Sequence, residues 1–175
     1  MPTLLYRFDD TDAFPFLETE SCVRGAVELR LEGNSPNQHL HLSWARTDGD
    51  PPEPSIVMGL PFRAIDGCPV QVLLEVCGDA GGSRLLLEAG DARGWGFAYG
   101  LGRIDFRGWR TCAADVQKPC EFWGAHEAGP WAGLSPPVQL QRLKIALDPS
   151  CRGVELQFGE LTISGTVRIT HPGIA

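Results

Sequence analysis

The chain has 175 residues, with 22 acidic and 15 basic side chains and a formal net charge of −7 at pH 7. This length suffices for one hydrophobic core, so residues 1–175 are expected to form a single domain. The acidic balance argues against a nucleic-acid partner, which requires a basic surface. No apolar run approaches the roughly 20 residues of a membrane span, so no membrane partner is expected.

The first ten residues lack the basic start and apolar centre of a secretory signal. Localisation therefore stays open, and would be extracellular or periplasmic if the chain is part of a longer secreted protein.

Short strands are predicted in the first third of the chain. Apolar and polar side chains alternate at 26–31 and 40–44, the period of two that is typical of a strand with one buried face. Residues 4–8 and 55–60 are predicted to form two further short strands. Residues 47–54, TDGDPPEP, contain three prolines and a glycine and are expected to form an exposed loop.

The central segment 69–110 predicts further strands separated by Gly/Asp turns. Residues 70–76 and 84–89 alternate on either side of the turn 78–83, GDAGGS, and are expected to form a hairpin. Another strand follows at 95–99. The apolar neighbours of Trp109 and Trp44 predict that both indoles are buried, and we take a Trp109 sealed between two sheets as the test of the arrangement.

The last third predicts a loop and then more strands. Residues 117–137 are rich in glycine and proline and are expected to form a long loop of the kind that carries function. Strands are predicted at 138–147, and at 154–158 paired with 161–167. Many short strands at hairpin spacing, with weak helical periodicity, favour an all-β fold: an antiparallel two-sheet β-sandwich of the jelly-roll type.

The six cysteines allow 15 complete sets of disulfides, and their spacing in the sequence excludes few of these sets. Cys68 and Cys77 bracket one predicted strand and stand too far apart to pair. Cys112 and Cys120 flank a predicted reversal and can pair, although reduced cysteines acting as small apolar residues remain the alternative. No zinc-type spacing is present.

Several segments resemble the galactose-binding-like jelly-roll domains that accompany bacterial glycoside hydrolases as non-catalytic carbohydrate-binding modules. They are GDAGGSRL at 78–85, GRIDFRGWR at 102–110, Trp123-Gly124 and the closing strand 153–163. The resemblance implies an accessory domain that binds a poly- or oligosaccharide, with a catalytic domain in the same polypeptide as its partner. It also implies a structural Ca²⁺ held by Glu160 with oxygens near the chain start; Asp9, Asp10 and Glu28 are the other candidate ligands, unless these acids are ordinary surface groups.

Sugar binding requires flat aromatic faces and planar polar side chains. We expect loop aromatics and a polar sheet face to provide them, with Trp131 as the best exposed platform. The candidates are Trp131, Trp123, Trp95, His126, Arg93, Tyr99, Gln71, Glu75 and Glu88.

No catalytic role is expected. Glu75 and Glu88 would face each other across the predicted hairpin, as the two carboxylates of a glycoside hydrolase do across its cleft. Such acids on a solvent-exposed sheet face are, however, usually solvated or paired with arginine. His39 and His41 share one face of a strand and have no apparent third metal ligand. No serine or cysteine nucleophile motif is present. The competing function is that of a structural or protein-interaction sandwich in a larger multidomain protein, with no glycan binding of its own.

Overall fold

The computed structural model describes residues 1–8, 16–17, 21–34, 38–124 and 133–170. The regular structure of these ranges is antiparallel β-sheet, in twelve strands. Within them the chain forms no helix long and apolar enough to cross a membrane.

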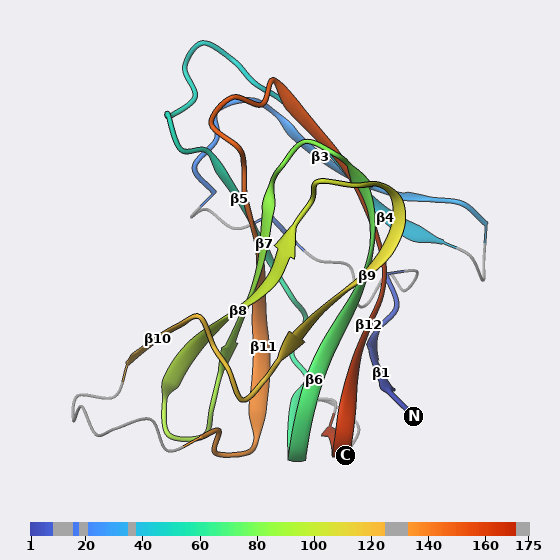
Figure 1. Ribbon diagram of the computed structural model, residues 1–175, viewed down its shortest axis with the longest axis vertical. Coiled ribbons are helices and arrows are strands. Elements are labelled where there is room, and N and C mark those ends of the chain that lie inside the picture. Colours follow the sequence, from blue (N-terminus) through green and yellow to red (C-terminus); the bar gives the residue numbers. More distant parts are fainter. Residues whose placement is uncertain (9–15, 18–20, 35–37, 125–132, 171–175) are drawn as a thin grey trace.

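The first of two layers is built on the two longest strands, which run side by side on the right of Figure 1. In order across the layer the strands are β9 (Arg107–Asp115), β6 (Ala64–Asp79), β12 (Gly153–Thr170), β4 (His39–Ala45) and β3 (Val27–Glu32), with β1 (Thr3–Tyr6) beside β12. Strand β4 pairs with the first part of β12, and β1 pairs with a later part.

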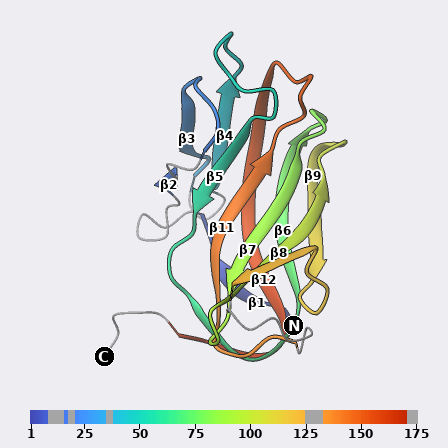
Figure 2. The same ribbon diagram turned by 90° about the vertical axis from the view of Figure 1, so that its left-hand side faces the viewer.

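The second layer faces the viewer in Figure 2. Its strands are, in order, β10 (Glu121–Gly124), β8 (Trp95–Arg103), β7 (Arg84–Gly90), β11 (Val138–Ala146), β5 (Ser55–Gly59) and β2 (Phe16–Leu17). Two residue pairs between β11 and β6 join the layers into one hydrogen-bonded network: Val138 with Ile65, and Gln139 with Ala64.

The core lies between the layers and follows the alternation of the strands. Val72, Leu74 and Val76 of β6 point inward, while Leu73 and Glu75 between them do not. Leu87 of β7 and Phe158 of β12 are also fully buried. Trp44 is buried with 4% exposure, as predicted. The structure thus confirms the all-β antiparallel sandwich.

The predicted hairpin of 70–76 with 84–89 is wrong. Strand β6 pairs with β9 and β12, whereas β7 pairs with β8 and β11 in the other layer. The turn at 78–83 therefore carries the chain across the sandwich instead of back along the same sheet. The second predicted hairpin, of 154–158 with 161–167, is also wrong, because β12 runs through both segments and only shifts its register between Phe158 and Leu161.

Trp109 is exposed, and the expectation that it is sealed in the core is wrong. Its side chain is 52% accessible. Along β9 the residues that point inward are Cys112 and Ala114, so the alternation of the strand turns Trp109 outward. The sandwich does not depend on this indole, because its interior is filled by the alternating residues of both layers.

All six cysteines lie within the described ranges, and none of them is in a disulfide there. Cys112 is buried, and burial raises the pKa of its thiol. The exposed Cys120 donates from Sγ to the carbonyl of Ala98 at 3.2 Å. The disulfide that their spacing allowed is therefore not formed.

Candidate functional site

A groove of about 570 Å³ lies on the outer face of the first layer. Its volume is in the range of small-molecule and cofactor sites. Strands β4, β6, β9 and β12 contribute side chains, and the residue after β1 closes one side. The lining residues are Arg7, Gln38, His39, Glu75, Trp109, Arg110, Thr111, Gly159 and Glu160.

The indole of Trp109 extends across the sheet from β9. Its backbone is paired with Cys77 of β6, yet its Cζ3 atom would lie only 3.3 Å from a Cβ placed on Gly159 of β12. The ring of His39 on β4 meets the indole edge-on, with centroids 5.5 Å apart and planes at 80°. An aromatic surface that is half open to solvent thus lies over the neighbouring strands.

Gly159 makes room for this arrangement. A Cβ at this position would come within 2.7 Å of the Glu75 Oε2 atom, closer than real side chains approach. The register of β12 shifts at this point, and the backbone N–H of Glu160 donates to Glu75 Oε2 at 3.3 Å. The missing side chain lets the Glu75 carboxylate lie against the backbone beside the indole.

Arg7 and Glu160 form the charged side of the groove. The guanidinium donates from Nε and Nη2 to Glu160 Oε1 at 3.0 and 2.8 Å. Both side chains are about half exposed, at 45% and 40%. Such an exposed pair contributes little to stability, but it presents planar hydrogen-bonding groups at a fixed place.

The groove therefore joins an aromatic surface to polar groups of both donor and acceptor type. Apolar C–H faces of a ligand can pack on the indole of Trp109, while hydroxyl groups can bond to Glu75, Glu160, Arg7 and Gln38. This combination is the chemistry that was expected of a sugar site.

The predicted polar sheet face is present in part. Glu75 and Gln71 both lie on the outer face of β6, and Glu75 lines the groove. Gln71 lies further along the strand, where its carbonyl accepts a hydrogen bond from Ser164 Oγ at 3.4 Å. Glu88 belongs to β7 in the other layer, where its Oε2 atom lies 3.8 Å from Nη1 of Arg142. Glu75 and Glu88 therefore do not face each other, which corrects the predicted juxtaposition.

The predicted aromatics gather elsewhere. Trp95 is partly buried at the start of β8, and Trp123 of β10 is 43% exposed beside it. Tyr99 was expected in or beside a loop, but it lies within β8 and is 1% exposed, and burial together with the charge of Asp91 raises its pKa. Its ring is not available to a ligand. Trp131 and His126 lie outside the described residues.

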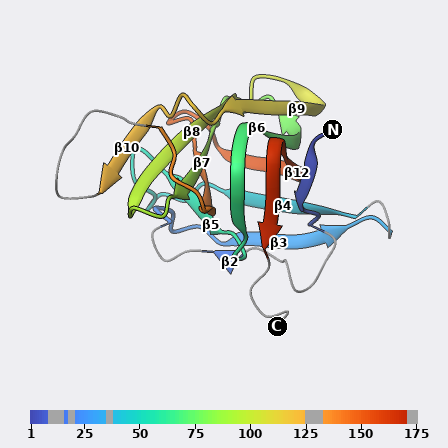
Figure 3. The same ribbon diagram turned by 90° about the horizontal axis from the view of Figure 1, so that it is seen from below.

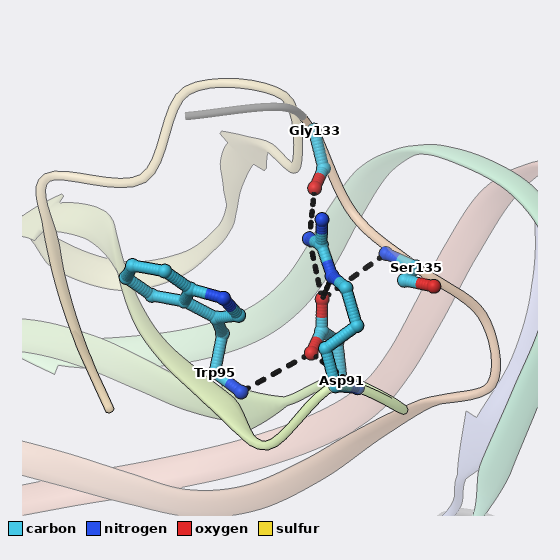
Figure 4. Close-up of polar contacts among 5 residues, drawn as sticks. Asp91, Trp95, Gly133 and Ser135 are labelled. Atoms are coloured by element: carbon cyan, nitrogen blue, oxygen red, sulfur yellow. Dashed lines mark hydrogen bonds and ion pairs between the residues drawn. The ribbon is translucent and has the colours of Figure 1, made fainter. Parts of the chain in front are cut away.

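Arg93 is held in a turn of the second layer. Its guanidinium binds the Asp91 carboxylate and the carbonyl of Gly133 (Figure 4). This turn stands near Trp95 and not near Trp109, so the predicted residues divide between two places. Figures 1 and 3 show β10 at one side of the molecule and β1 at the other.

The calcium candidates that the structure describes do not converge. Glu160 is bound by Arg7, and Glu28 lines a different hollow, with Asp79 and Glu155. In the described part of the chain no three His, Cys, Asp or Glu side chains are grouped as metal ligands. Asp9 and Asp10 lie outside that part, so a calcium ion shared by them and Glu160 stays a prediction.

Sequence reasoning missed Trp109, His39 and Arg7 as groove residues. For Trp109 the signal was available. Every second residue of a strand lies on the same face, and the positions two and four residues away from Trp109 are polar: Asp105, Arg107 and Thr111. For Arg7 and His39 no local signal exists, since their strands meet β12 only through long-range pairing.

No family model and no curated protein matches this chain. Solved structures do. The family 11 carbohydrate-binding module of the cellulosomal cellulase Lic26A-Cel5E of Clostridium thermocellum aligns with a TM-score of 0.58 and 11% identity over 95% of each chain. The Clostridium thermocellum family 11 module in complex with a β-1,3-1,4-mixed-linked tetrasaccharide aligns with a TM-score of 0.54 and 11% identity, over 94% of this chain and 95% of that one. The chain thus has the jelly-roll fold of these carbohydrate-binding modules.

Proposed function

We propose that this protein is a non-catalytic module that binds an oligo- or polysaccharide in the groove over β6, β9 and β12. The observation that carries the proposal is the half-exposed indole of Trp109, which lies across the sheet beside the carboxylates of Glu75 and Glu160. An aromatic surface bordered by planar hydrogen-bonding groups suits a pyranose chain. The shared fold with carbohydrate-binding modules supports the same function.

A non-catalytic role agrees with the state of the carboxylates. Glu160 is engaged by the Arg7 guanidinium through two hydrogen bonds, and Glu75 accepts from the backbone of Glu160. Weak binding of a few sugar rings would hold a catalytic domain of the same polypeptide near its polysaccharide by raising its effective concentration.

Affinity electrophoresis in gels that contain soluble polysaccharides tests this function. The panel includes neutral glucans, xylans, mannans and a polyuronate, and titration calorimetry with the β-1,3-1,4-mixed-linked tetrasaccharide complements it. We expect retardation by at least one polymer and its loss in Trp109→Ala.

The matched control is Phe122→Ala, because Phe122 is an aromatic residue that is similarly exposed, at 55%, and lies outside the groove. If the Trp109→Ala variant is still retarded by the polymer, the binding site lies outside the groove. No retardation by any polymer would contradict glycan binding and favour the competing function, an interaction domain of a larger protein.

A further inference from the structure

A second hollow, of about 310 Å³, lies at the end of the second layer, where β10 borders β8. Of the described residues, none lines both this hollow and the groove. Its walls are side chains from β8, β10 and β11 and from the segment before β6. The side chains with aromatic or amide groups are Phe62, Trp95, Trp123, Gln139 and Gln141.

Two glycines form the floor of this hollow. Gly90 of β7 and Gly96 of β8 are direct partners in the sheet. A Cβ on Gly96 would lie 2.3 Å from the Nε1 atom of Trp123, and a Cβ on Gly90 would lie 2.6 Å from the Nε2 atom of Gln141. The indole and the amide therefore both rest directly on the backbone, side by side, because neither glycine carries a side chain.

The turn before β8 fixes the rim. The side chain of Asp91 is fully inaccessible. Its carboxylate accepts from the backbone N–H groups of Arg93, Trp95 and Ser135 at 2.9, 3.2 and 3.2 Å, and from the Arg93 guanidinium at 2.8 and 3.1 Å (Figure 4). This set of bonds places Trp95 and leaves the carboxylate no capacity for a ligand.

The hollow consequently has no available charge among the residues described. Among the described residues, Asp91 is the one ionisable residue that lines it, and the guanidinium of the nearby Arg93 binds Asp91 and the carbonyl of Gly133. What remains open to a ligand is the indole of Trp123, which is 43% exposed, and the amides of Gln139 and Gln141. Each amide donates and accepts hydrogen bonds, as a sugar hydroxyl does.

We propose that this hollow is a second glycan site, which holds a single neutral pyranose ring against the indole of Trp123. The C–H face of the ring packs on the indole, and its hydroxyl groups bond to Gln139 and Gln141. A uronic acid or a phosphorylated sugar is selected against, because its charge would lose water without gaining a cation. The inference goes beyond the groove and does not depend on it.

The test uses the NMR signals of the indole N–H groups in the full chain, assigned with single tryptophan variants. The probes are the methyl glycosides of glucose, galactose, mannose and xylose, with galacturonic acid as the charged probe. We expect at least one neutral glycoside to shift the Trp123 signal with a dissociation constant in the millimolar range. Gln141→Ala should weaken this binding about fivefold, the usual effect of one lost hydrogen bond.

Trp109→Ala is the matched control and should leave the titration of the Trp123 signal unchanged. The inference is overturned if no neutral glycoside shifts that signal, if galacturonic acid binds equally well, or if Gln141→Ala has no effect. Because the groove is tested by polymer binding to Trp109→Ala, failure of one site is distinguishable from failure of the other.

Discussion

Trp109 and His39 come from strands β9 and β4 and make an edge-to-face contact, with ring centroids 5.5 Å apart. Strands β6 and β12 lie between these two strands in the sheet, so the contact bridges the groove floor. An aromatic pair of this geometry contributes about 0.5–1.5 kcal/mol beyond its buried area. It holds the indole in place before a ligand arrives.

His39→Ala should therefore weaken polysaccharide binding by roughly three- to tenfold, the equivalent of that coupling. The free energy of unfolding should fall by about 0.5–1.5 kcal/mol, because the same contact is present in the protein without ligand. Titration calorimetry and urea unfolding measure the two effects. His39→Phe is the control that keeps an aromatic edge; it should retain binding, and a loss as large as that of His39→Ala would contradict this role of the ring.

Gly159→Ala should abolish binding in the groove while leaving the protein folded. The new Cβ would meet Glu75 Oε2 at 2.7 Å and the Trp109 ring at 3.3 Å, so both side chains must move. The cost to the free energy of unfolding should be about 1–3 kcal/mol, as for other overpacked positions. Gly100→Ala is the matched control, because a Cβ there meets nothing within 4 Å. Equal polymer binding by both variants would show that the positions of Glu75 and Trp109 do not matter.

Asp91→Asn should destabilise the protein by about 1–3 kcal/mol at pH 7, because the amide cannot accept all the bonds that the carboxylate accepts. Burial opposes the ionisation of Asp91, but hydrogen bonds from Arg93, Trp95 and Ser135 outweigh it and lower its pKa. Because the pKa of Asp91 is lower in the folded state, its ionised carboxylate stabilises the fold above the unfolded-state pKa of about 3.9. This stabilisation is lost as the pH falls through the folded-state pKa.

The difference in the free energy of unfolding between wild type and Asp91→Asn should thus shrink below about pH 4. Urea unfolding at pH 7 and pH 3 measures it, with the exposed Asp105→Asn as the control. A difference that is the same at both pH values would rule out the charge of Asp91 as its source.

Tyr99→Phe should leave glycan binding unchanged and keep or raise the melting temperature. The hydroxyl of Tyr99 is buried and has no hydrogen-bond partner among the described residues. Removing an unsatisfied buried polar group relieves a desolvation cost of about 1–3 kcal/mol. Thermal unfolding measures the effect. A melting temperature lowered by several degrees would reveal a partner for this hydroxyl, and lost binding would restore Tyr99 as a ligand contact.

The sequence predicted the strands well and their partners poorly. Alternation in residues 70–76 and 84–89 correctly identified parts of β6 and β7, since the period of two reports which side chains are buried. It does not report which strand lies alongside, and a Gly-rich turn serves equally well to cross between layers. The hairpin expected there consequently became two strands in different sheets.

The sites show the same limit. Glu75 was placed correctly on a wet sheet face, but its neighbours Arg7 and His39 come from strands distant in sequence. Trp109 was misjudged because its apolar neighbours were weighed more heavily than its parity with Arg107 and Thr111. Trp95 and Trp123 do lie together, as their paired strands β8 and β10 require.

The positions of Trp109 and Trp123 on separate layers have a consequence for polymers. A straight polysaccharide that follows the outer face of the first layer does not pass the hollow beside β10, which lies toward the other side of the molecule (Figures 1 and 3). With both places occupied, one protein molecule would bind a polysaccharide chain in the groove and one sugar ring of a second chain beside β10, and would thus cross-link the two chains. Mixtures with long soluble glycans would then thicken or turn turbid, and free monosaccharide would reverse the effect.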